Sequence, residues 1–176
     1  MKNLVHLASA LGTSVHVDLF ELLVEDFYNN KQAYMQAADT TPSGQKKMSP
    51  SAVLSVMVDE GLMYRSEKKV FRWEHDKILE AAMIKKSKRA KVYLHIGEML
   101  QNKLSKEQLD THLFVVVRLL NEGSKLIPTT NSHKRVNLAE LNLAAGKKSI
   151  DNSGFVSAQT YFNKGIKLLP SNHGRV

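Results

Sequence analysis

The stretch VFRWEHDKILEAAM, residues 70–83, changes character in its middle. Its first residues, Val70, Phe71 and Trp73, are of the β-branched and aromatic types that favour strands. Its second half, DKILEAAM, is rich in residues that favour helices. The change falls at Glu74-His75-Asp76, without a glycine or a proline. The stretch therefore predicts a strand that leads directly into a helix at about Asp76.

The residues before this stretch predict a hairpin and a preceding helix. In LMYRSEKKVFRWEH, residues 62–75, apolar and polar side chains alternate around Ser66-Glu67-Lys68-Lys69, so we expect a β-hairpin from about Leu62 to Trp73. In SPSAVLSVMVDEG, residues 49–61, a serine suited to an N-cap precedes a proline, and a glycine ends the apolar pattern. This second pattern predicts a helix over Ser51–Glu60.

Two more helices are predicted near the start of the sequence. Apolar residues recur at helical spacing over Leu4–Leu11, where a glycine follows, and again over Val17–Phe27. Asp18 falls in the first turn of the second helix, where a carboxylate suits the helix dipole. The polar stretch Asn29–Met48 predicts a long loop, partly helical near residues 32–38.

The rest of the chain is predicted to be helical. We expect a helix from about Asp76 to Lys86, and then helices within RAKVYLHIGEMLQNK (residues 89–103), KEQLDTHLFVVVRLLNEG (106–123), RVNLAELNLAAGKKSIDNSG (135–154) and FVSAQTYFNKGIKLLP (155–170). The stretch IPTTNSHK, residues 127–134, reads as a loop, and Asp151–Gly154 as a short turn.

Composition agrees with a helical, intracellular protein. The chain has 176 residues, of which 43% are hydrophobic and only 7% aromatic, a mixture that favours helices over strands. It has no cysteine, which excludes disulfides and thiolate chemistry and favours a reducing compartment. No apolar run approaches the roughly 20 residues needed to span a bilayer. We therefore expect a cytoplasmic location and no membrane partner.

The net charge of +8 is open to two interpretations. It is typical of proteins that bind nucleic acid or an acidic membrane. It also suits a fragment of a longer protein whose compensating acidic residues lie elsewhere, and we favour this interpretation.

The densest basic run is KKSKRAK at Lys85–Lys91. It is either a phosphate-binding patch or a solvated face between two helices, and we favour the solvated face.

The order of the predicted elements indicates two domains. Helix, helix, loop, helix and hairpin over residues 1–84 is the plan of a winged helix, in which the hairpin is the wing. Residues 85–176 form helix pairs, and the last pair has the tetratricopeptide pattern of small, small, large, small and proline at Gly146, Ala158, Phe162, Gly165 and Pro170.

Two residues depart from that pattern. Asn142 and Ser149 stand where a large apolar and an aromatic residue are usual. We predict a mainly α fold, in which a winged-helix-like domain with a small β-hairpin is followed by tetratricopeptide-like antiparallel helix pairs. Gly165 is expected to meet the partner helix near Gly146.

Several blocks together resemble one family. LASALGTSVHVDLFELL, VFRWEHDKILEAAM, YLHIGEML, LLNEGSKLI and LAELNLAAGKKSIDNSGFVSAQTYFNKGIKLL are similar, in this order, to large AAA-type signal-transduction ATPases with numerous domains. The resemblance covers nearly the whole chain, apart from Asn29–Met48. It implies a segment just downstream of a nucleotide-binding domain. Many members of the family are predicted to carry a protein-kinase domain before the ATPase and sensor or histidine-kinase domains after it.

The sequence offers no convincing reaction centre. AAGKKS, residues 144–149, is the string closest to a phosphate-binding loop, but it lacks the earlier glycine and lies within a predicted helix. The seven histidines are dispersed and form no metal-binding pair. His75 and Asp76 could be imagined as an acid–base pair, but we interpret Asp76 as a capping carboxylate and His75 as a residue packed against the wing. We predict no catalytic, cofactor-binding or metal-binding residue and no cofactor.

Two functions remain in competition. The first is a non-catalytic regulatory and protein-interaction segment, whose partners are the ATPase domain and the downstream signalling domains of the parent chain. The alternative is a DNA-binding winged helix. A DNA-reading helix needs basic and amide side chains, whereas Ser51–Glu60 has no Lys, Arg, Asn or Gln and ends in two carboxylates. We therefore favour the first function and expect no specific nucleic-acid partner. An independent enzyme is the third and least supported reading.

Overall fold

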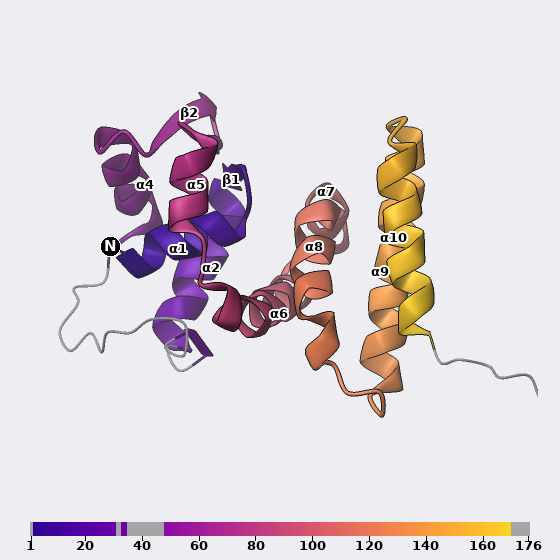
Figure 1. Cartoon of the computed structure of the whole chain (residues 1–176). Helices are drawn as coiled ribbons and strands as arrows, with labels where there is room; N and C mark the ends of the chain where they lie inside the picture. Colours follow the sequence, from indigo (N-terminus) through magenta and orange to yellow (C-terminus); the bar gives the residue numbers. More distant parts are fainter. Residues whose placement is uncertain (1, 31–32, 35–47, 170–176) are drawn as a thin grey trace, which may run out of the picture. The chain divides into compact units, whose positions relative to one another are not determined.

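A computed structural model of the chain describes residues 2–30, 33–34 and 48–169. The fold is mainly α-helical, with a small antiparallel sheet in its N-terminal part (Figure 1). The chain divides into two compact units, Met1–Ile96 and Gly97–Val176, and the division falls inside a helix, α6 (Lys86–Lys103). The predicted domain boundary, between residues 84 and 85, lies just before this helix begins.

The described residues of the first unit form three strands and several helices. Its strands are β1 (Ser14–His16), β2 (Met63–Glu67) and β3 (Val70–Trp73). Its helices among the described residues are α1 (Lys2–Ala10), α2 (Val17–Asn29), α4 (Pro50–Asp59), α5 (Asp76–Ala82) and the first part of α6. Most of the predicted loop Asn29–Met48 lies outside the described residues. Of the possible helix near residues 32–38, only Ala33 and Tyr34 are described, and both are helical.

The predicted hairpin is confirmed, and it belongs to a three-stranded sheet of order β1-β3-β2. β2 and β3 pair antiparallel around a turn at Lys68 and Lys69, with an irregularity between Arg65 and Glu67. The third strand, β1, pairs antiparallel with β3 and was not predicted. β1 is only three residues long, and the strand with which it pairs is remote in the sequence, so no local sequence pattern predicts it.

A hydrogen bond from a side chain holds the central strand against the start of β1. Trp73 Nε1 donates to the carbonyl oxygen of Gly12 at 3.0 Å, across a sequence separation of 61 residues.

Two glycines with positive φ follow helices of this unit. Gly12 has φ of 101° and follows α1, while Gly61 has φ of 67° and follows α4. The predicted helix ends at both glycines are confirmed, and both residues have the left-handed backbone that glycine tolerates.

Helix α4 begins and ends where the sequence indicated. The Ser49 hydroxyl accepts a hydrogen bond from the backbone N–H of Ala52, and Pro50 occupies the first helical position. Apolar residues of α2, α4 and the sheet form the core of this unit, all of them fully or almost fully buried: Val15, Leu19, Phe20, Leu23, Val53, Leu54, Met57 and Met63.

The predicted helix Asp76–Lys86 is wrong at its C-terminal end. Helix α5 stops at Ala82, and Met83 has extended backbone geometry. The carbonyl oxygen of Ala82 is occupied by α1, because Ser9 Oγ donates to it at 2.9 Å and His6 Nδ1 lies 2.6 Å from it. These contacts with α1 replace the helical hydrogen bond that continuation of α5 would supply.

Up to residue 169, where the described part of the chain ends, the second unit contains the rest of α6 and five further helical segments. These are α7 (Lys106–Thr111), α8 (Leu113–Gly123), the 3₁₀ helix η1 (Ser124–Leu126), α9 (Ser132–Asp151) and α10 (Phe155–Leu168). The single helix predicted over residues 106–123 is therefore wrong, because it is broken at His112, whose φ and ψ are −101° and 16°. Neither glycine nor proline marks this break.

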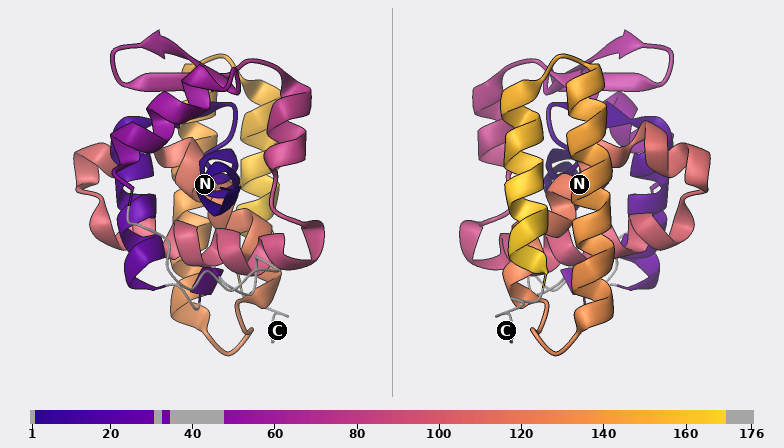
Figure 2. Two further views of the ribbon diagram at one scale, coloured as in Figure 1. Left: turned by 90° about the vertical axis from the view of Figure 1, so that its left-hand side faces the viewer. Right: turned by 90° about the vertical axis from the view of Figure 1, so that its right-hand side faces the viewer.

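Helices α9 and α10 form the antiparallel pair that the sequence predicted (Figure 2). α8 packs against α9, and the buried residues Leu113, Val117 and Ala145 form an apolar cluster at this contact. Phe114 and Tyr161, both partly buried, stack with their ring centroids 5.9 Å apart. The helix pair is thereby held to the remainder of the second unit through one side.

We expect Gly165→Leu to lower the free energy of unfolding by about 1–3 kcal/mol, because overpacking a close helix contact costs about that much. A Cβ at Gly165 would lie 3.3 Å from the Ala139 carbonyl oxygen and from Asn142 Cβ. The measurement is urea unfolding followed by circular dichroism. Ala144→Leu, at an exposed position of α9, is the control, and equal stability of both variants would contradict the packing.

Candidate interaction surface

A shallow apolar groove runs between α9 and α10. It has a volume of about 450 Å³ and is lined by Val136, Ala139, Glu140, Leu143, Phe162, Gly165, Ile166 and Leu169. Only one of these side chains is charged. Val136 is 37% exposed, Leu143 48% and Ile166 68%. Exposed apolar residues gathered in one place are typical of a surface that binds another molecule.

Two close approaches hold α9 and α10 together next to this groove. A Cβ at Gly146 would overlap the ring of Phe162, so the ring can lie on the α9 backbone only because residue 146 has no side chain. Gly165 lies against Ala139 and Asn142. Gly165 therefore meets the partner helix, as predicted. The contact lies at Ala139 and Asn142, the second of which is about one helical turn before Gly146.

A pair of amides anchors α9 on α8. Asn142 is fully buried, and its Nδ2 donates to Asn121 Oδ1 at 3.0 Å and to the Leu138 carbonyl oxygen at 2.8 Å. Asn121 Nδ2 in turn donates to Asn142 Oδ1 at 2.9 Å. This reciprocal pair satisfies the buried amide. It explains why a polar residue stands where the tetratricopeptide pattern has a large apolar one.

Ion pairs add to the attachment of α9. Lys134 Nζ lies 2.7 Å from Glu98 Oε1, and Lys148 Nζ lies 2.8 Å from Asp110 Oδ2. Exposed pairs of this kind contribute little stability, typically about 0–1 kcal/mol. Lys148 belongs to AAGKKS, which lies within α9 as predicted, and its glycine is the Gly146 covered by Phe162.

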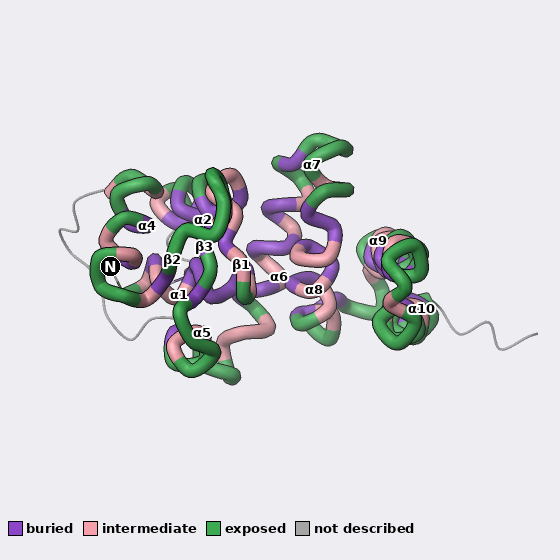
Figure 3. The backbone as a smooth tube through the Cα atoms, turned by 90° about the horizontal axis from the view of Figure 1, so that it is seen from above, coloured by how far each residue is buried: buried purple, intermediate pink, exposed green. Residues whose placement is uncertain are grey.

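Helix α4, which would read DNA in a winged helix, presents small and acidic side chains. Val53, Leu54 and Met57 face the core, whereas Ser51, Ser55 and Asp59 are exposed. Figure 3 shows the exposed residues of this helix in green. Hydroxyl groups can bond to DNA, but the carboxylate at the end of the helix would repel phosphate.

The basic run Lys85–Lys91 covers the start of α6. Lys85, Lys86 and Lys91 are exposed, in keeping with the solvated face that we predicted. Arg89 is partly buried, and its Nε and a terminal nitrogen donate to the Ile84 carbonyl oxygen, both at 3.2 Å. This arginine therefore stabilises the bend between α5 and α6.

The interpretation of His75 and Asp76 is correct only in part. Asp76 is the first residue of α5, where its charge suits the helix dipole, but the N-cap residue is His75. His75 makes no side-chain capping hydrogen bond and is exposed, so the prediction that it packs against the hairpin is wrong. The stretch is a corner between two elements, and both side chains point to solvent.

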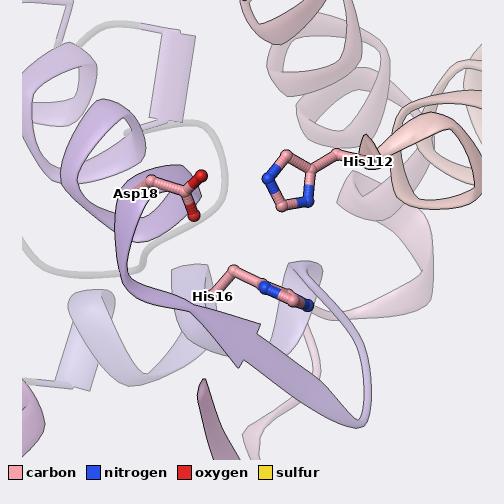
Figure 4. Close-up of side chains that lie close together, drawn as sticks. All are labelled: His16, Asp18 and His112. Atoms are coloured by element: carbon pink, nitrogen blue, oxygen red, sulfur yellow. The ribbon is translucent and has the colours of Figure 1, made fainter. Parts of the chain in front are cut away.

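Two other histidines mark the ends of elements. His16 ends β1, where it pairs with Val70, and it is the N-cap residue of α2. Asp18 lies in the first turn of α2 as predicted, and its Oδ1 accepts a hydrogen bond from the backbone N–H of Leu19 at 2.9 Å. His112, which is 6% exposed, occupies the junction of α7 and α8. Figure 4 draws these three side chains.

The sequence analysis missed a buried polar cluster around Asp26, which is 4% exposed. Asp26 Oδ2 accepts a hydrogen bond from the Tyr34 hydroxyl at 2.5 Å and lies 2.8 Å from His95 Nε2. Asn30 Nδ2 donates to Asp26 Oδ1 at 2.7 Å. The signal was present, because Asp26 lies three residues after Leu23 and seven after Leu19, on the apolar side of α2.

The electrostatics of this cluster favour an ionised carboxylate. Burial opposes ionisation, but the hydrogen bonds from Tyr34, His95 and Asn30 outweigh it and lower the pKa of Asp26 below its usual value. Burial and the neighbouring carboxylate raise the pKa of Tyr34, so its phenol stays a donor.

The hydrogen bonds of this cluster differ from those of a catalytic triad. In a hydrolytic triad the nucleophile bonds to the histidine. Tyr34 bonds to the carboxylate instead, so we assign the cluster to packing between α2 and the first part of α6.

Among the described residues, no helix is both long enough and apolar enough to cross a membrane.

We expect Asp26→Asn to lower the free energy of unfolding at pH 7 by about 1–3 kcal/mol, because an amide cannot accept all the donors that converge on the carboxylate. The folded-state pKa of Asp26 is depressed, so its contribution to stability is complete above about pH 4 and is lost as the pH falls through the lower folded-state value.

The measurement is urea unfolding at neutral and acid pH. The difference between the native protein and Asp26→Asn should shrink below about pH 4. Glu21→Gln, at an exposed position of the same helix, is the control. A difference that stays constant at all pH values would contradict this role.

No protein-family model matches the chain, and comparisons with curated proteins and with solved structures found no match.

Proposed function

We propose that the chain is a non-catalytic regulatory and protein-interaction segment of a multidomain signalling ATPase. It would couple a nucleotide-binding domain, outside this chain, to a helical scaffold that binds downstream signalling domains. The observation that carries the proposal is the exposed apolar groove between α9 and α10, which suits the packing of another helix. Such a segment would act in the cytoplasm without a cofactor of its own.

The first unit would be a winged-helix-like domain. In its favour, the elements follow the order α1, β1, α2, α4, β2 and β3, and β1 completes a sheet with the hairpin. The small and acidic surface of α4 suits a protein contact better than a phosphate backbone. We propose that this surface docks on the ATPase domain.

The second unit would carry a tetratricopeptide-like helix pair. The antiparallel arrangement of α9 and α10 and the contact of Gly146 with Phe162 support this assignment. The proline of the pattern, Pro170, lies outside the described residues. In repeats of this kind each helix pair buries its apolar side against a neighbour, so an exposed apolar side invites a further helix.

The docking of the first unit can be tested by hydrogen–deuterium exchange. We propose that the coding region upstream of Met1 encodes an ATPase domain, and adding that domain should slow amide exchange in α4. Unchanged exchange in α4, or an upstream region without a phosphate-binding loop, would contradict the proposal. Exchange in α10 serves as the internal reference.

The second candidate is a DNA-binding winged helix, which the net charge of +8 and the lysines at the hairpin tip favour. We expect only weak DNA binding, without sequence preference, that heparin competes away and salt abolishes, since phosphate contacts alone would supply the affinity.

The measurement is selection from a random DNA library at near-physiological salt. Changing Lys85, Lys86, Lys88 and Arg89 together to Gln should weaken binding as much as changes near α4. Enrichment of one motif, lost on changing Ser51 or Ser55, would replace the first function by the second.

A further inference from the structure

The corner between α5 and α6, residues 83–85, interrupts a stretch whose sequence favours one continuous helix. Residues 76–96 contain neither glycine nor proline, and Met83, Ile84 and Lys85 are of types that helices accept. Met83 nevertheless has extended backbone, with φ of −64° and ψ of 142°, and the next helix begins only at Lys86. Figure 1 shows α5 and the start of α6 running in different directions.

Side chains of α1 occupy the backbone group that would continue α5. A helix without glycine or proline breaks where side chains insert into its ladder of hydrogen bonds. The carbonyl oxygen of Ala82 accepts a hydrogen bond from Ser9 Oγ at 2.9 Å, and His6 Nδ1 lies 2.6 Å from the same oxygen. A carbonyl oxygen only accepts, so this histidine nitrogen carries the proton. In a continuous helix the backbone N–H of Lys86 would bond to this oxygen instead.

Helix α1 also covers the apolar residue of the corner. Ile84 is only 4% exposed. It lines a cavity of about 20 Å³ together with Asn3, His6, Leu7, Phe27, Tyr34 and Val92, the first three of which belong to α1. On the side of α6 the contact is local, because Arg89 donates to the Ile84 carbonyl oxygen. The bent form therefore depends on the position of α1.

We infer that the corner is a two-state element controlled by α1. With α1 in place the chain bends at Met83, and with α1 displaced α5 and α6 join into one helix over residues 76–103. In this joined helix the N–H groups of residues 86–88 bond to the carbonyl oxygens of residues 82–84, so the backbone stays paired without α1. Exposure of Ile84 opposes joining, so the bent form is the stable one while α1 covers that side chain.

The inference rests on the proposed function only for its trigger. The nucleotide-binding domain of that proposal would act by moving α1. Because α5 follows β3 closely, joining changes the direction in which α6 leaves the sheet, and α6 continues into the second unit. The corner would thus pass a displacement of α1 to the helix that leads toward the second unit.

The test changes both donors to Ala82 in the whole chain, as His6→Ala with Ser9→Ala. The bent form loses two hydrogen bonds and the joined helix loses none, so the population of the joined helix should rise at least about tenfold. The measurement is chemical-exchange saturation transfer on the Cα nuclei of residues 83–85, which detects minor states that exchange in microseconds to milliseconds. The joined helix is recognised by helical shifts at all three residues.

A proline provides the matched control. The Lys85 carbonyl oxygen accepts from the N–H of Arg89, so Lys86 is the first residue of α6, where proline is well accepted. Lys86→Pro leaves the bent form intact, but it removes the N–H that the joined helix needs. Added to the double variant, it should abolish the helical minor state. Lys2→Ala, at an exposed position of α1, should leave residues 83–85 as they are in the native chain.

Three results would overturn the inference. They are no helical minor state in the double variant, coil shifts at residues 83–85 that report local unfolding, or helical shifts that persist after Lys86→Pro. None of them bears on α4. Exchange protection of α4 by the ATPase domain, which tests the proposed function, can therefore succeed or fail independently.

Discussion

Phe162 lies directly on the backbone of α9 at Gly146, and the form of the helix pair depends on that contact. A side chain at residue 146 would push the helices apart by the width of a methyl group or more. The shallow groove would then widen, and Gly165 would leave Ala139 and Asn142. One position without a side chain thus determines both the closeness of the helices and the shape of the surface that they present to a partner.

The side of α9 that packs on α8 combines an apolar cluster of Leu113, Val117 and Ala145 with a buried pair of amides. Asn142 and Asn121 satisfy each other in an otherwise apolar surrounding. A buried amide pair is tolerated only when its donors and acceptors meet, so it also restricts the register of α9 on α8. The helix pair is therefore attached to α8 on one side, and it leaves the apolar side chains of the groove exposed.

The sequence predicted correctly those elements whose ends are marked by neighbouring residues. Ser49, Pro50 and Gly61 delimit α4, and the alternation on either side of Lys68 and Lys69 predicts the hairpin. The missed features depend on distant partners. β1 exists because β3 offers it a free edge, α5 ends early because α1 occupies the Ala82 carbonyl, and Asp26 is stabilised by Tyr34 and by His95, which is 69 residues away.

The sequence alone could not identify the candidate surface between α9 and α10 either. The heptad-like spacing of Val136, Leu143 and Ile150 is visible in the sequence, but apolar residues at helical spacing usually face a core. Only the packing of α8 against the other side of α9 shows that these residues are left exposed. The absence of basic side chains from α4, in contrast, can be read from the sequence alone.

The most direct measurement is a methyl NMR titration of the chain, labelled at Ile, Leu and Val, with the downstream signalling domains of the parent protein. The proposed docking predicts that the shifts are confined to Val136, Leu143, Ile150, Ile166 and Leu169, while the methyl groups of Val156 and of α4 stay unchanged. Shifts centred on Val53, Leu54 and Val58 of α4, with the groove methyl groups unmoved, would contradict it.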